Sequence, residues 1–177
     1  MANSSKANLA TLFRELAIPD NYGESPALAT YAEATELVDA GLNIVGRMQR
    51  LTPATDNCWS AMQAAAHEDG CELLMVSGFR SIEYQAGLIR KKIASGQIID
   101  DILQVNVAPG FSQHHTGRAI DIATPGFKPL LEDFEKSPAF GWLQQNAEKF
   151  EFSMSYPRAN PEGINYEPWH WYRKAGS

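Results

Sequence analysis

The chain is poor in cysteine, histidine and positive charge, and it has no long apolar run. Two cysteines are too few for a disulfide scaffold or for a zinc cluster built from cysteines alone. Fifteen Lys and Arg against twenty-one Asp and Glu give a net charge of -6, so we expect no nucleic-acid partner. No apolar run reaches the roughly 18 residues that a membrane span needs, so we expect no membrane span.

What remains is an ordinary globular composition, with 44% hydrophobic and 20% charged residues. A length of 177 residues suits one domain with a sizeable core, and we expect a single monomeric domain over residues 1–177. Residues 1–6 lead into an amphipathic segment and show no signal-peptide apolar stretch. Cys58 and Cys71 fall near opposite ends of one predicted helix, roughly 15–20 Å apart, which predicts two buried free thiols.

Periodicity and capping residues predict the secondary structure. Thr52 and Ser81 are the expected helix N-caps, Pro53 takes the first helical position, and Gly70 and Gly96 end the two helices. The predicted helices are 4–17, 53–70, 82–96 and 129–149, with a short helical piece at 98–103. The predicted strands are 73–76, 118–123, 152–156 and 169–172, with a weak hairpin over 36–51 around Gly41. This order predicts an α+β fold with a small, mainly antiparallel sheet flanked by helices.

Three of the four histidines lie in two C-terminal segments, residues 112–121 and 167–171. A catalytic zinc ion takes three protein ligands and leaves one position open for water. His114, Asp121 and His170 would supply such a set. Gly117 permits a tight turn between the first two, so that Asp121 projects from the strand that follows.

Glu167 precedes His170 by three residues, with Pro168 between them. Proline pushes the residue before it into an extended or polyproline conformation. A polyproline segment has three residues per turn and would place Glu167 and His170 on one side, whereas a regular strand would separate them. A helical zinc motif with two histidines is excluded by the proline.

Each of these residues alone has a simpler interpretation, as a hydrogen-bonded histidine, a capping aspartate or a solvated glutamate. The five-position pattern from Ser112 to Asp121 is rarer, arising by chance on the order of once in several thousand chains of this length. The remaining histidines fit a metal site less well. His115 is expected behind the site or exposed, and His67 on a solvent-facing helix surface.

The two segments resemble the zinc D-alanyl-D-alanine carboxypeptidases of the VanY type, in the superfamily of lysostaphin, D-Ala-D-Ala metallopeptidases and hedgehog signalling domains. The matching pattern is Ser112-x-His114-x-x-Gly117-x-Ala119-x-Asp121, followed by Glu167-x-Trp169-His170. Two more elements resemble the family, namely Ser77-Gly78-Phe79-Arg80-Ser81 with Gln85, and Ser155-Tyr156-Pro157. The resemblance covers residues 50–174 as the catalytic core and leaves 1–45 as a helical and loop extension. Glu151 departs from it, standing where the family usually has glycine.

The resemblance implies one zinc ion per chain, bound by His114, Asp121 and His170. It implies that Glu167 is the general base and that Arg80 stabilises the oxyanion or holds the substrate. Gln85 and Ser112 become candidates for substrate binding or for supporting the site. Trp169 either lines a substrate groove or packs against the last strand.

The expected activity is hydrolysis of the C-terminal D-Ala peptide bond of a peptidoglycan stem peptide or another D-Ala-terminated peptide. An L,D-carboxypeptidase or a peptidoglycan endopeptidase would use the same centre. An iron(II) oxygenase also uses two histidines and a carboxylate, but it needs neither Glu167 nor Arg80. A non-catalytic zinc-binding module is a further alternative, against which both residues argue. The site of action is expected in the periplasm or elsewhere outside the cytoplasm, with a cytoplasmic enzyme or a phage lysin as alternatives.

Overall fold

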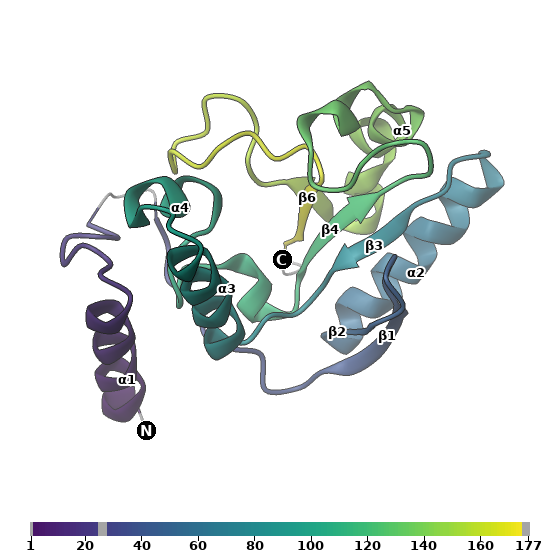
Figure 1. Cartoon of the computed structure of the whole chain (residues 1–177). Helices are drawn as coiled ribbons and strands as arrows, with labels where there is room; N and C mark the ends of the chain where they lie inside the picture. Colours follow the sequence, from purple (N-terminus) through teal and green to yellow (C-terminus); the bar gives the residue numbers. More distant parts are fainter. Residues whose placement is uncertain (1, 25–27, 175–177) are drawn as a thin grey trace.

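The structure, a computed structural model, describes residues 2–24 and 28–174 (Figure 1). Its helices are α1 (Ala2–Glu15), α2 (Pro53–Glu68), α3 (Ile82–Ala94), α4 (Ile99–Val105) and α5 (Pro138–Asn146). Its strands are β1 (Val38–Leu42), β2 (Met48–Leu51), β3 (Leu74–Ser77), β4 (Ala119–Ala123), β5 (Phe152–Met154) and β6 (His170–Arg173). Short 3-10 helices span Gln113–Thr116, Glu132–Lys136 and Ala147–Phe150. The α+β prediction is confirmed.

The central sheet is antiparallel throughout, with strand order β3-β4-β6-β5. Its register pairs Ser77 with Asp121 and Asp121 with His170, so these three residues form a row across the sheet. Successive side chains of a strand point to opposite faces. Ile120 and Ile122 of β4 join the main hydrophobic core, and Asp121 between them points to the other face. The sheet therefore places polar groups on one face and the core on the other.

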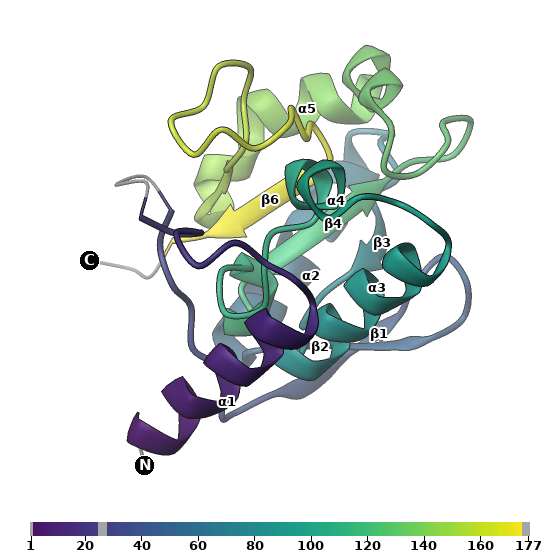
Figure 2. The same cartoon turned by 60° about the vertical axis from the view of Figure 1, so that its left-hand side comes forward.

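Two hydrophobic clusters lie on the two sides of the sheet. The first packs α2 and α5 against it and contains Trp59, Met62, Leu143 and Trp171. The second joins the end of α1 to α3 and α4 through Leu16 and several partners, namely Ile18, Ala86, Ile89, Ile102, Leu103 and Ala108. Figure 2 shows α1, α3 and α4 in front of the sheet and α2 behind it. The face that carries Asp121 thus looks toward α3.

The predicted hairpin is present as β1 and β2, but its turn is not at Gly41. The turn lies at residues 43–47, where the Asn43 side-chain oxygen accepts hydrogen bonds from the backbone N–H groups of Val45 (3.1 Å) and Arg47 (2.9 Å). An Asn side chain that bonds the backbone just after it is a common turn device. Gly41 instead lies inside β1, at φ 94°, where the pairing register shifts.

The single helix predicted over 129–149 is wrong. Ser137 is extended (φ -78°, ψ 149°) and separates the 3-10 helix at Glu132–Lys136 from α5. The residue before a proline avoids the helical region, and Pro138 follows directly. Ser137 Oγ then accepts a hydrogen bond from Phe140 N (3.1 Å), as an N-cap. Leu130, predicted in the core, lies outside this helix and is exposed.

Smaller predictions have mixed outcomes. Thr52 lies at the N-cap of α2, but its hydroxyl bonds Thr55 Oγ1 (2.8 Å) and not the backbone. Both cysteines are free thiols as predicted, yet they are half-buried and not buried. Glu151 adopts φ 66°, a left-handed conformation that explains why glycine suits this position.

Within the described residues, no helix is both long and apolar enough to cross a membrane.

Candidate active site

The structure brings the three predicted metal ligands together from three separate elements. His114 lies in the 3-10 helix at Gln113–Thr116, Asp121 in β4, and His170 at the start of β6. One ligand atom from each lies within 4.8 Å of the others, and all three side chains are buried. Because the pairing of β4 with β6 sets Asp121 opposite His170, the sheet register brings two of the three predicted metal ligands together.

Gly117 ends the 3-10 helix and turns the chain into β4. Its φ is 63°, and a Cβ added there would lie 2.8 Å from Leu37 Cδ2 and 3.2 Å from Thr52 N. A larger residue would meet both a strained backbone and a steric clash. The predicted structural role of Gly117 is thereby explained.

Each histidine has one ring nitrogen held by an oxygen acceptor, so that the other faces the site. His114 Nδ1 lies 2.7 Å from the Gly78 carbonyl oxygen, and His114 Nε2 lies 3.2 Å from Asp121 Oδ1. His170 Nε2 lies 2.9 Å from Gln113 Oε1, and His170 Nδ1 lies 3.0 Å from the same Asp121 oxygen. An oxygen acceptor behind the ring is the usual arrangement around a metal-binding histidine.

The charge states also suit a cation. Burial, together with the positive charge of Arg80, lowers the pKa of His114 to about 4. Burial alone would raise the pKa of Asp121, but His114 and Arg80 hold it well below its usual range. A neutral imidazole and an ionised carboxylate are the protonation states that metal binding requires.

Arg80 lies just after the end of β3, and its side chain contacts the Asp121 carboxylate. Its guanidinium forms an ion pair with Asp121 Oδ2, and its Nε donates to Ser77 Oγ (2.9 Å). Its backbone N–H donates to the His114 carbonyl (3.2 Å), which ties the two loops together. No local pattern indicates that Arg80 pairs with a predicted ligand, because 41 positions separate Arg80 from Asp121.

Glu167 lies on the loop before β6, with Oε2 3.9 Å from His170 Nδ1. The predicted placement on the same side as His170 is therefore confirmed, although the backbone reason differs. A turn produces it, in which His170 N–H donates to the Glu167 carbonyl (3.1 Å) across Pro168 and Trp169. Burial raises the pKa of Glu167 to about 7. A carboxyl group that titrates near neutrality can both take and give a proton.

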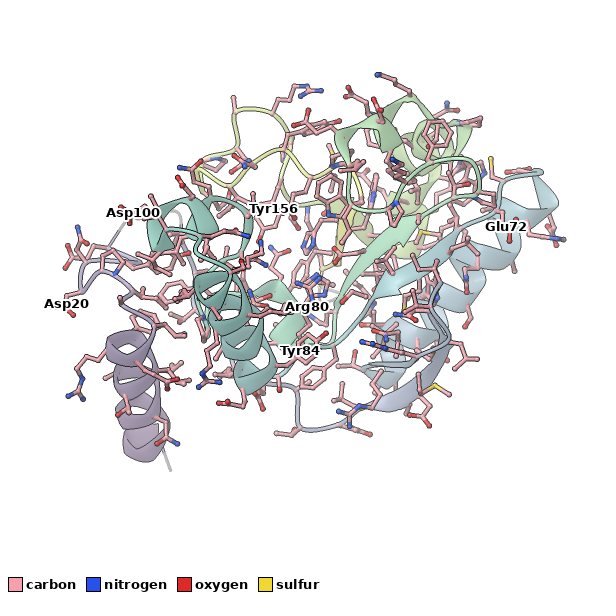
Figure 3. The ribbon with its side chains drawn as sticks, in the orientation of Figure 1. Asp20, Glu72, Arg80, Tyr84, Asp100 and Tyr156 are labelled. Atoms are coloured by element: carbon pink, nitrogen blue, oxygen red, sulfur yellow. The ribbon has the colours of Figure 1, made fainter. Side chains whose placement is uncertain are left out.

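A cavity of about 860 Å³ opens over these groups, and residues of both α3 and the sheet line it. In Figure 3 the labelled side chains of Arg80, Tyr84 and Tyr156 lie in this region, and all three line the cavity. The cavity is also lined by the other predicted site residues, namely Gln85, Ser112, His114, Asp121, Glu167, Trp169 and His170.

The predicted substrate-binding residues have different surroundings. Gln85 is buried and donates to the Val107 carbonyl (2.8 Å), while its Oε1 has no hydrogen-bond partner among the described residues. Ser112 Oγ accepts from His114 N (3.3 Å), so this hydroxyl caps the loop that carries His114. Trp169 both lines the cavity and packs against the main core, so the two interpretations of it are compatible.

The other two histidines stay outside the donor set. His115 is fully buried, with Nδ1 2.7 Å from the Arg80 carbonyl and Nε2 accepting from Gly110 N (3.0 Å). It therefore supports the loop from behind and is not exposed. His67 is exposed, as predicted.

Two residues near the site, Gln113 and Tyr156, have contacts that the sequence does not predict. Gln113 contacts His170 through a hydrogen bond between residues 57 positions apart, which no local pattern indicates. The Tyr156 ring lies 4.9 Å from the His170 ring, centroid to centroid. The sequence signal for Tyr156 is its place in Ser155-Tyr156-Pro157, an element that resembles the family.

Comparison with known proteins agrees with this geometry. A family model described as "VanY: D-alanyl-D-alanine carboxypeptidase" matches residues 48–174. The putative carboxypeptidase YodJ of Bacillus subtilis (strain 168) is 31% identical over 176 residues, which cover 92% of this chain and 58% of that protein. This chain thus spans little more than half the length of that relative.

Solved structures show the same fold. The LdcB LD-carboxypeptidase superposes with a TM-score of 0.71 at 29% identity, covering 83% of this chain and 72% of that chain. VanYB in complex with D-alanine-D-alanine superposes with a TM-score of 0.64 at 26% identity, covering 86% and 83%. Because the family model matches well over half of the residues, the chain belongs to the VanY family of D-alanyl-D-alanine carboxypeptidases.

Proposed function

We propose that this chain is a zinc-dependent carboxypeptidase that hydrolyses the C-terminal D-Ala peptide bond of peptidoglycan stem peptides. The observation that carries the proposal is the buried group of His114, Asp121 and His170, with the Glu167 carboxyl group beside it and a cavity above it. Such a peptidase would act where the cell wall lies, in the periplasm or elsewhere outside the cytoplasm.

The donor set fits one zinc ion per chain. Two imidazole nitrogens and one carboxylate oxygen are ligands that zinc accepts, and three protein ligands leave a position for water. When bound, zinc supplies a hydroxide nucleophile near neutral pH and polarises the peptide carbonyl. His114 and His170 hold their donor nitrogens toward this position because Gly78 and Gln113 engage the opposite nitrogens.

Glu167 moves the protons of the reaction. Its carboxylate would take a proton from the attacking water and later give it to the amine of the departing D-Ala. Burial raises the pKa of Glu167 to about 7, so the group can exchange its proton with both partners near neutral pH. The Glu167 side chain is 15% exposed and lines the cavity, so it is open to the cavity while its solvation is limited.

Arg80 supplies the positive charge that the reaction needs near the scissile carbonyl. Its side chain is 16% exposed and lines the cavity beside Asp121. A guanidinium group there would stabilise the oxyanion or hold the free carboxylate of the substrate. The further candidates for substrate contacts are Ser112, Trp169 and Gln85, whose Oε1 has no hydrogen-bond partner in the part of the chain that the structure describes.

Cleavage of an L,D bond is the second candidate. LdcB, whose fold this chain shares, is an LD-carboxypeptidase, and VanYB binds D-alanine-D-alanine. The same zinc centre serves both reactions, because specificity depends on the shape of the pocket around it. Because the chain belongs to a peptidase family, peptide hydrolysis is a better proposal than an iron(II) oxygenase reaction.

The test is to incubate the zinc-loaded protein with stem pentapeptide and stem tetrapeptide and to weigh the products by mass spectrometry. Release of one alanine from the pentapeptide supports the D,D activity, and release from the tetrapeptide alone supports the L,D activity. Internal cleavage of cross-linked peptides would indicate an endopeptidase. A zinc-loaded protein that cleaves none of them would be a non-catalytic module, and the proposal would be wrong.

A further inference from the structure

A segment that precedes the matched family region lies directly behind the candidate metal centre. The family model begins at residue 48, yet residues 28–36 run along the loop that carries His114. Tyr31 N–H donates to the Gly110 carbonyl (2.7 Å), and Ala34 N–H donates to the His115 carbonyl (2.8 Å). The backbone of this segment is therefore fixed at both ends of residues 110–115.

The side chain of Tyr31 continues this connection toward the site through Gln113. Gln113 is 9% exposed, and both ends of its side-chain amide have partners. Its Oε1 faces His170 Nε2 at 2.9 Å and accepts from Ser155 Oγ at 2.6 Å. Its Nε2 donates to the Tyr31 hydroxyl at 3.4 Å.

This arrangement bears on which nitrogen of His170 faces the metal. An amide oxygen only accepts, so the ring nitrogen that faces it carries the proton. With the proton on Nε2, the lone pair of His170 lies on Nδ1, which is the nitrogen beside Asp121. In this orientation the amide nitrogen also has a partner, the Tyr31 hydroxyl on the far side, so that both ends of the Gln113 amide are hydrogen-bonded.

We propose that Gln113 and Tyr31 are positioning residues for the metal centre, which hold His170 with Nδ1 directed at the metal. The segment around Tyr31 is then a functional part of the centre, although it lies before the family region. The inference rests on the proposed metal site but not on the peptidase activity. Removing the acceptor behind a metal-binding histidine typically costs 10- to 100-fold in metal affinity.

Zinc affinity, measured by competition with a chromophoric chelator, tests this inference without using substrate. We expect Gln113→Leu to weaken zinc binding by about 10- to 100-fold. Gln113→Glu keeps an acceptor toward His170 and should bind zinc within a few-fold of the wild type or more tightly. The matched control is Gln63→Leu, because Gln63 is also part-buried and donates to a backbone carbonyl, that of Leu73 (2.9 Å). This control should leave zinc affinity unchanged.

Tyr31→Phe tests the second link of the connection. It should weaken zinc binding by a few-fold in the wild-type chain and should have no further effect in the Gln113→Leu chain, since Tyr31 acts through Gln113. Wild-type zinc affinity in Gln113→Leu would overturn the inference, as would equal defects in Gln113→Leu and Gln113→Glu, which would indicate packing alone.

Nitrogen NMR of the zinc-loaded wild-type protein gives an answer even where Gln113→Leu fails to fold. We expect the His170 ring to carry its proton on Nε2 and to bind through Nδ1, and the reverse assignment would overturn the inference. If the protein binds zinc in this way but cleaves no peptide, the proposed function fails and the positioning role stands.

Discussion

At the scale of single residues, Glu167 combines burial with a position beside the donor set. Burial raises its pKa to about 7, and the charge of a bound zinc ion would lower it, so the acid limb of the kcat/KM profile is expected at or below pH 7. The sign follows from the role of a base, because the carboxylate is lost as the pH falls, and the rate falls with it. We expect Glu167→Gln to lack this limb.

The same substitution should retain zinc while lowering kcat by about 10²- to 10⁴-fold, the usual contribution of a general base. Zinc content and circular dichroism, measured on the same preparation, separate this effect from loss of the metal or of the fold. A Glu167→Gln variant that turns over at the wild-type rate would show that another group takes the proton.

Arg80 is the second residue whose role can be measured directly. Loss of one group that stabilises an oxyanion typically costs about 10²- to 10³-fold, so Arg80→Gln should lower kcat/KM by that amount. Arg80→Lys keeps the charge but not the planar guanidinium group that contacts both Ser77 and Asp121. Its kcat/KM should therefore lie between those of the wild type and Arg80→Gln. Arg80→Gln within threefold of the wild type would exclude a role for this guanidinium in the reaction.

The sequence predicts the site at the residue scale better than it predicts the connections between its residues. His114, Asp121, His170, Glu167 and Arg80 stand in local patterns, and the structure brings them together around one cavity. The contact of Gln113 with His170 depends on strand pairing between distant segments, which no local spacing encodes. The ion pair of Arg80 with Asp121 escapes prediction for the same reason.

At the scale of helices and strands, the failures have local causes that tertiary packing does not override. Apolar periodicity over 129–149 indicates one helix, but the avoidance of helical geometry before Pro138 breaks it at Ser137. The polyproline interpretation of Glu167 and His170 reaches the right placement through the wrong backbone, because a turn and a polyproline segment both bring residues three apart onto one side. Periodicity alone therefore identifies neighbours more reliably than backbone conformation.

Glu151 stands in a left-handed backbone conformation, at a position where the family usually has glycine. It holds φ 66°, where a side chain costs about 1–2 kcal/mol, and its half-exposed ion pair with Arg173 (2.5 Å) returns at most about 1 kcal/mol. We expect Glu151→Gly to raise the free energy of unfolding by up to about 1 kcal/mol, as measured by urea denaturation. Glu148→Gly, within the preceding 3-10 helix, is the control and should lower it by about 0.5–1 kcal/mol. A loss of stability in Glu151→Gly would mean that the ion pair outweighs the strain.

At the scale of the whole molecule, the candidate site lies between two hydrophobic clusters. The cluster of α2 and α5 holds the sheet, while the cluster of α1, α3 and α4 forms the opposite side, where Gln85 of α3 lines the cavity. The loops that carry Arg80 and His114 run between them. A site built in this way keeps its geometry only if the two clusters fold as one unit.

The positions of the tryptophans make it possible to measure whether the two clusters unfold together. All four tryptophans lie in the α2 and α5 cluster or against it, so tryptophan fluorescence reports on that cluster, whereas far-ultraviolet circular dichroism reports on every helix. Leu16 lies in the other cluster and is 1% exposed, so Leu16→Ala should lower the free energy of unfolding by about 2–5 kcal/mol. If the domain is one cooperative unit, the urea midpoints from both probes fall together, although no tryptophan contributes to the cluster that holds Leu16. A dichroism midpoint that falls while the fluorescence midpoint stays would show that α1, α3 and α4 unfold separately, and the Arg80 loop would then lose one of its two supports without global unfolding.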